Sequence, residues 1–182
     1  LSALLRAITA TLAPVFSSEL GLQPADLGLL AGAYFLGFAS LQLPLGRALD
    51  HFGPRRVQMA LLSLAVVGCA AFSQAQGLMS LSAARLLIGM GVAACLMAPL
   101  TCYRHIFDAS MQLRLNSWML MTGSLGMLAS TLPVQMALPY WGWRGLFVAL
   151  AGLLLVALLL IAWFVPKADH AAAAQPGGRY RD

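Results

Sequence analysis

The amino-acid sequence predicts an all-α membrane protein with six transmembrane helices in an inverted 3+3 repeat. Three observations lead to this prediction: the composition, six long apolar segments and an internal repeat. Of the 182 residues, 60% are hydrophobic and only 9% are charged, whereas ordinary globular domains carry about 45–50% apolar and roughly 25% charged residues. A soluble fold of this size needs more polar surface than this chain supplies. The composition therefore argues against a soluble enzyme, a disordered chain and a nucleic-acid-binding protein.

The apolar residues are grouped into segments of membrane-spanning length. A helix needs about 20 apolar residues to cross a hydrocarbon core of roughly 30 Å. The predicted spans are 1–16, 25–45, 57–75, 79–101, 115–137 and 145–165. Residues 1–165 thus form one predicted bundle, and the Ala-, Pro- and Gly-containing stretch 166–182 is expected to be a solvated cytoplasmic linker or tail. Because Leu1 already lies inside an apolar run, we expect a fragment or processed chain that starts partway through its first helix.

Basic residues are distributed unevenly between the two sets of connectors. One set holds Arg47, Arg55, Arg56, Arg104, Arg114, Lys167, Arg179 and Arg181. The other set (17–24, 73–78 and 137–144) holds only Arg144. Lys and Arg in short loops mark the cytoplasmic side, so both chain ends are expected in the cytoplasm of a multi-pass plasma-membrane protein, in the inner membrane of a bacterium. The net charge of +5 is therefore a topology signal and does not indicate nucleic-acid binding.

Residues 36–57 and 125–146 resemble one another at a shift of 89 positions. Eight of the 22 aligned positions are identical, among them Pro44 with Pro133, Gly53 with Gly142, and Arg55 with Arg144. The two copies lie three spans apart, so they point in opposite directions across the membrane. Inverted repeats of three helices are typical of secondary transporters. Two similar helix connectors that arose independently remain the alternative.

The connector after the second span resembles motif A of the major facilitator superfamily, G-x-L-x-D-R-x-G-R-R. The matching residues are Gly46, Asp50, Gly53, Arg55 and Arg56. The sequence departs from the pattern at His51 and Pro54, where Arg or Lys is usual. We expect Gly46 to allow a close helix approach, Gly53 to permit the turn, and Asp50 to pair with Arg55 or Arg56.

Two further segments carry the same resemblance. Arg85, Gly89 and Gly91 in the fourth span are similar to motif B of the superfamily, R-x-x-x-G-x-G, and residues 142–147 look like the G-W-R-x-x-F found where span six of such carriers begins. The resemblance covers about residues 1–165 and implies the amino-terminal half of a twelve-helix facilitator, whose second half is missing from this chain. It implies secondary active transport of a small solute by alternating access, with a proton as the candidate coupling ion. The fifth span lacks the adjacent Gly-Pro of the proton-linked drug antiporters, which argues against that subgroup.

Arg6 and Arg85 are the basic residues inside predicted spans. A guanidinium at mid-membrane depth costs at least ~2.5–3.5 kcal/mol, so Arg6 should face the bundle interior or a wet cavity. There it would suit an anionic solute, bound as a bidentate carboxylate or phosphate. Snorkelling, an ion pair with the missing half and bonding to helix carbonyls are the alternatives. Arg85 is expected to have a structural or gating role.

Tyr34, Trp118, Thr122 and Ser124 are the further candidates for lining a central cavity, although each could equally serve helix packing. Trp141 and Trp143 are expected to anchor the membrane interface.

Other functional classes have little support in the sequence. An intramembrane protease would need a general base within hydrogen-bond reach of a nucleophilic serine such as Ser124. The three histidines, His51, His105 and His170, all fall in predicted cytoplasmic segments, so none can take that role. Cys69, Cys95 and Cys102 have no metal-ligand spacing and are expected to be small buried hydrophobic residues. We therefore expect no enzyme, cofactor or metal site. The alternative function is a six-helix channel or membrane scaffold without carrier activity.

Overall fold

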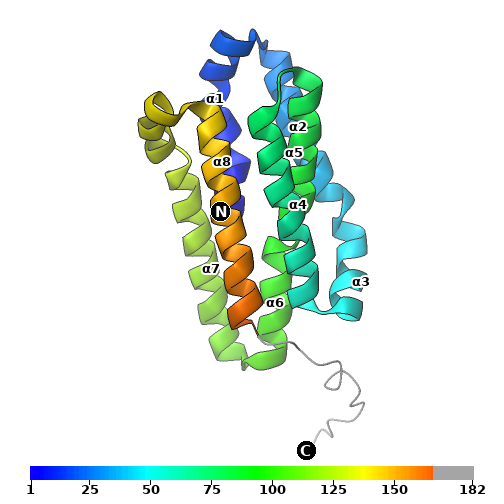
Figure 1. Cartoon of the computed structure of the whole chain (residues 1–182). Coiled ribbons are helices and arrows are strands. Elements are labelled where there is room, and N and C mark those ends of the chain that lie inside the picture. The colour runs from blue at the N-terminus through cyan, green and yellow to red at the C-terminus, as the bar shows by residue number, and fades with distance from the viewer. Residues whose placement is uncertain (166–182) are drawn as a thin grey trace, which may run out of the picture.

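A computed structural model describes residues 1–165, and all regular structure in that range is helical. The helices are α1 (Ser2–Leu20), α2 (Pro24–Ser40), α3 (Gln42–Phe52), α4 (Pro54–Gln74), α5 (Leu78–Val92), α6 (Ala94–Ile106), α7 (Ala109–Ala129) and α8 (Leu132–Phe164). Their axes run roughly along one direction and form an elongated bundle (Figure 1). The predicted cytoplasmic tail, 166–182, lies outside the described residues.

The predicted spans 1–16 and 57–75 overlap α1 and α4, while 25–45 and 79–101 each cover two helices, α2 with α3 and α5 with α6. The predicted span 115–137 runs from α7 into α8, and 145–165 lies in the second part of α8. Three helical segments of the described chain are long and apolar enough to cross a membrane: Pro54–Gln74, Leu78–Arg104 and Leu132–Phe164. The pair α2 and α3, bent by 42°, makes a fourth if it is one span. The helices α1 and α7 fall short of this standard because they carry more polar residues. The structure therefore supports an all-helical membrane protein with three or four candidate spans, and the six-span count stays a prediction.

The connectors predicted to be cytoplasmic gather at one end of the bundle. In Figure 1 the α3–α4 junction, the α6–α7 junction and the end of α8 lie at the lower end. The α1–α2 and α4–α5 connectors and the bend of α8 lie at the upper end (Figure 1). The basic connectors and the connectors poor in basic residues are thus segregated, as a polytopic topology requires.

Several backbone irregularities divide the helices, among them the following in residues 36–57 and 125–146. The breaks at Leu41, between α2 and α3, and at Ser130, after α7, keep αR backbone angles. Sharp turns follow at Gly53 (φ 81°, ψ 153°) and at Gly142 (φ 62°, ψ 171°), which splits α8 into two helices. Positive φ is strained for residues with a Cβ, so glycine is the natural residue at both turns.

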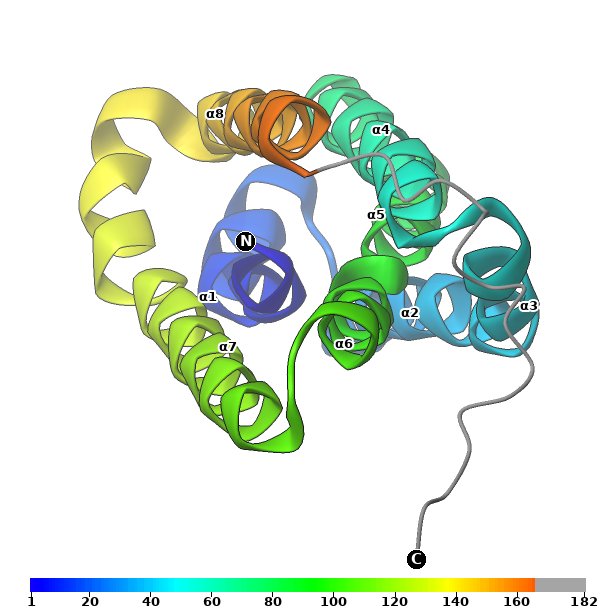
Figure 2. The same cartoon turned by 90° about the horizontal axis from the view of Figure 1, so that it is seen from below.

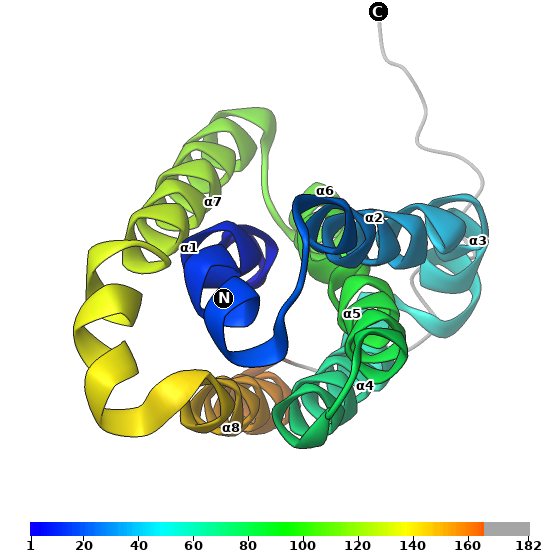
Figure 3. The same ribbon diagram turned by 90° about the horizontal axis from the view of Figure 1, so that it is seen from above.

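The interior of the bundle is built around α1. Viewed along the bundle axis, α1 lies inside an incomplete ring formed by the other helices (Figures 2 and 3). It buries Leu5, Ile8, Leu12 and Phe16 at helical spacing. The ring of Phe16 meets the ring of Trp143 edge to face at 5.5 Å, a favoured geometry for aromatic pairs. Helix α1 is therefore held in place by an apolar stripe and by an aromatic cluster near its C-terminal end.

Close helix crossings depend on glycines in α2 and α5. A Cβ at Gly37 would overlap the backbone carbonyl of Leu86, and one at Gly89 would overlap the carbonyl of Tyr34. A Cβ at Gly91 would overlap the backbone of Ala65 in α4. By contrast, no atom lies within 4 Å of where a Cβ of Gly46 would sit, so the close approach expected there is not made within the described residues. Small residues let helix backbones approach closely in membranes, and here the motif B glycines do so.

Replacing Gly37 with alanine should destabilise the bundle, because the new methyl group meets the α5 backbone. We expect Gly37→Ala to lower the free energy of unfolding of the full-length protein by about 1–3 kcal/mol, the usual cost of overpacking. The matched control is Gly32→Ala on the same helix, where a Cβ has no neighbour within 4 Å. That control should be neutral or stabilising by up to about 1 kcal/mol, because alanine favours helix. Denaturant unfolding in detergent measures both, and equal stability of the two variants would contradict the tight crossing.

Candidate functional site

A cavity of about 340 Å³ opens between α1, α2, α6 and α7. Three of the residues predicted from sequence to line a central site meet on it: Arg6 from α1, Tyr34 from α2 and Ser124 from α7. The other lining residues are apolar or small, and Cys95 is the one cysteine among them. The cavity therefore combines apolar walls with a few polar groups, which is the usual character of a small-molecule site.

Arg6 is the one charged side chain that lines this cavity among the described residues. It is exposed and takes part in no side-chain hydrogen bond or ion pair within residues 1–165. Its five N–H donors are thus available to a ligand, and an arginine fork matches a carboxylate or a phosphate in geometry. Arg6 consequently places one positive charge on the cavity wall.

The other two sequence candidates lie on an adjoining cavity of about 370 Å³. Trp118 and Thr122 line it, and it shares Ser2, Ala3, Met119 and Gly123 with the Arg6 cavity. The hydroxyl of Thr122 donates to the carbonyl of Trp118 at 2.8 Å. The five candidates are therefore distributed over two connected hollows along α1 and α7.

Arg85 is buried next to this site but lines neither cavity. Its Nη1 donates to the backbone carbonyl of Leu5 at 2.8 Å, and its guanidinium carbon lies 5.4 Å from the ring centre of Phe72 and 5.9 Å from that of Tyr34. Its Nε and Nη2 have no hydrogen-bond partner among the described residues. Arg85 thus ties α5 to α1 at the residue immediately before Arg6.

The motif A residues adopt a different arrangement from the one expected. Arg55 donates from Nη2 to the carbonyl of Ala162 near the end of α8, where helical carbonyls lack partners within their own helix. Arg56 and Asp50 are exposed, and neither forms an ion pair within residues 1–165. The expected pairing of Asp50 with either arginine is therefore absent from the described structure, and Arg55 contacts the end of a neighbouring helix.

A polar cluster at the opposite end was missed by the sequence reasoning. Trp143 is only 1% exposed and donates from Nε1 to a carboxylate oxygen of Glu19 at 2.8 Å. Arg144 donates to the carbonyl of Ala75 at 3.3 Å, and its guanidinium carbon lies 4.2 Å from the ring centre of Trp143. The assignment of Trp143 to the membrane interface was wrong, because the turn at Gly142 directs the indole into the bundle. Trp141 is 62% exposed, and its placement at the membrane interface stays a prediction.

No group of three or more His, Cys, Asp or Glu residues in the described chain could hold a metal ion.

Apolar helices of spanning length around a largely apolar cavity with a few polar groups define the class of this protein: a membrane-embedded helical bundle. The family model of the Major Facilitator Superfamily matches residues 1–180, and the chain belongs to that superfamily of transporters. An uncharacterized MFS-type transporter of Mycobacterium tuberculosis is 25% identical over 158 residues, which cover 86% of this chain and 27% of that protein. The chain thus spans about a quarter of that relative's length.

The charge of Arg6 should alter chemical reactivity inside the cavity. We introduce Ser124→Cys into the full-length protein with its native cysteines replaced by alanine. A negatively charged methanethiosulfonate should then react about fivefold faster than a positively charged one, because a nearby cation attracts the first reagent and repels the second.

Adding Arg6→Gln should remove most of this preference, whereas Arg104→Gln, at the end of α6 and outside the cavity lining, should leave it unchanged. Labelling rates followed by mass spectrometry measure the ratio. An unchanged ratio after Arg6→Gln would show that another group sets the field.

Proposed function

We propose that this chain is part of a secondary active carrier that moves a small anionic solute by alternating access, with Arg6 as the anion-binding residue. The observation that carries the proposal is an exposed guanidinium with no partner in the described residues, on a cavity between helices of a membrane bundle. An arginine inside a membrane bundle is costly and usually serves a ligand, an ion or a partner charge. Tyr34 and Ser124 supply hydroxyl groups on the same cavity.

Arg85 supports this site as a positioning residue. Its hydrogen bond to the carbonyl of Leu5 holds the backbone immediately before Arg6. Because Arg85 is completely buried, the bond is shielded from water and is stronger for it. We infer that Arg85 fixes the register of α1 against α5 and so aims Arg6 into the cavity, without contacting the solute itself.

The helical breaks support an inverted repeat of three spans. A shift of 89 positions carries Leu41 onto Ser130 and Gly53 onto Gly142. The first pair breaks spans two and five with similar αR angles, and the second pair makes turns of positive φ and extended ψ. Residues 24–53 and 109–142 therefore share the order helix, break, short helix and turn with positive φ, although the second break also includes Thr131 (φ −98°, ψ −97°).

Two arginines related by the same shift make reciprocal contacts. Arg55, at the start of α4, donates to the carbonyl of Ala162 near the end of α8. Arg144, at the start of the second part of α8, donates to the carbonyl of Ala75 at the end of α4. Each helix thus receives an arginine from the other at its carboxyl end. A pseudo-two-fold axis between α4 and α8 would produce this pattern, and such axes relate the repeats of many carriers.

The proposed carrier lies in a bacterial inner membrane, with both ends of this chain on the cytoplasmic side. A second six-helix half of the same protein would complete the cavity. The distribution of basic connectors supports the orientation, and the small share of the mycobacterial relative that is matched supports a longer protein. A proton is the proposed coupling ion, by family resemblance alone.

Removing the guanidinium of Arg6 should strongly reduce anion transport. We expect Arg6→Gln in the full-length protein to reduce uptake of organic anions into proteoliposomes by about 10- to 100-fold, since hydrogen bonds to charged groups contribute about 1.5–3 kcal/mol. Arg6→Lys should retain partial uptake, because the charge stays but the bidentate fork is lost. Arg114→Gln, on the exposed surface of α7, is the matched control. Wild-type uptake by Arg6→Gln at normal expression would overturn the anion-site assignment.

A further inference from the structure

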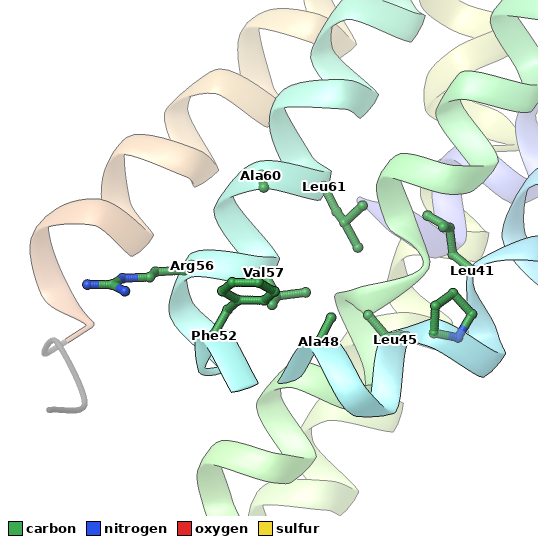
Figure 4. Close-up of a pocket in the computed structure, with 9 residues that line it drawn as sticks. Leu41, Leu45, Ala48, Phe52, Arg56, Val57, Ala60 and Leu61 are labelled. Atoms are coloured by element: carbon green, nitrogen blue, oxygen red, sulfur yellow. The ribbon is translucent and has the colours of Figure 1, made fainter. Parts of the chain in front are cut away.

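An apolar groove runs between α3 and the first turns of α4. It has a volume of about 390 Å³. Its walls are formed by Leu45, Ala48 and Phe52 of α3 and by Val57 and Leu61 of α4. Figure 4 shows these side chains facing one another across the groove, with the Phe52 ring at its edge. This volume is near the lower end of the range for small-ligand sites. It is therefore suited to one flexible apolar segment of a ligand.

A single cation lies at one side of this groove. Arg56 is the one charged residue of the lining, and its guanidinium points away from the apolar side chains (Figure 4). Arg56 is exposed and forms no ion pair or side-chain hydrogen bond within residues 1–165. Its neighbour Arg55 is already engaged with the carbonyl of Ala162. The two adjacent arginines therefore differ: Arg55 stabilises the bundle, and Arg56 is available to a ligand outside it.

Helix α3 and the start of α4, which form the groove, lie at the end of the bundle where the basic connectors gather (Figure 1). In the orientation proposed above, on which this inference rests, that end meets the cytoplasmic leaflet. Anionic lipids of that leaflet are attracted to arginines next to a spanning helix, and basic pockets between such helices bind anionic head groups. An apolar groove with one cation at its side matches an acyl chain joined to a phosphate.

We propose that this groove binds one anionic phospholipid, with a stretch of acyl chain between α3 and α4 and the head-group phosphate on Arg56. The lipid would then join the short helix α3 to α4 across the Gly53 turn. The site is separate from the solute cavity and shares no lining residue with it.

Lipid retention by the full-length protein tests the proposal directly. Native mass spectrometry is recorded with added phosphatidylglycerol or phosphatidylcholine. The wild-type protein should retain phosphatidylglycerol about fivefold better, the effect of roughly one arginine near an anionic lipid surface. Arg56→Gln should abolish the preference, Arg56→Lys should preserve it, and Arg114→Gln should have no effect.

A second pair of variants tests the groove itself. Ala60→Phe fills the groove, since Ala60 lines it, and should reduce retention of both lipids. Ala71→Phe, exposed on the same helix but outside the lining, is the control. A wild-type preference in Arg56→Gln, or equal lipid retention in Ala60→Phe and Ala71→Phe, would overturn the proposal. Because no solute is used, these results stand apart from the Arg6 uptake test, and either proposal can fail while the other holds.

Discussion

The close crossing of α5 with α2 and α4 is the constraint on which the rest of the structure depends. At this crossing backbone meets backbone, because Gly37, Gly89 and Gly91 leave no Cβ between the helices. Apolar side chains give little drive for association in lipid, so close packing of small residues has to supply it. The crossing also places the Tyr34 backbone against Gly89, which brings the Tyr34 ring beside Arg85 and onto the Arg6 cavity. Packing and site geometry therefore share one origin.

The few arginines of this chain differ in their surroundings more than in their sequence context. Arg85 is completely buried and holds the backbone of α1. Arg55 satisfies a helix end, while the adjacent Arg56 stays exposed beside an apolar groove. Arg6 opens onto the central cavity. A membrane bundle carries few charged residues because each charge is costly in hydrocarbon. Each of these four arginines has a different structural setting.

Much of the fold was predictable, because hydrophobic segments of about 20 residues and basic connectors are strong signals in a membrane sequence. Family membership followed from the motif residues around Asp50 and Arg85, and the family match confirms it. The burial of Trp143 was not predicted, since an indole at a span end usually marks the interface and the sequence alone does not show that the chain turns sharply at Gly142. The Asp50 pairing failed for a similar reason: sequence spacing cannot show that the α8 end comes within reach of Arg55. The solute-binding roles of Arg6, Tyr34, Trp118, Thr122 and Ser124 stay predictions.

The central claim, carriage of an anion by alternating access, is tested most directly by counterflow. The full-length protein is reconstituted in liposomes loaded with an excess of unlabelled organic anion, and entry of the labelled anion from outside is followed. A carrier must return its site across the membrane, so internal anion should accelerate labelled entry severalfold and drive a transient accumulation above equilibrium. Entry that is unaffected by internal anion and never exceeds equilibrium would contradict the account and indicate a channel.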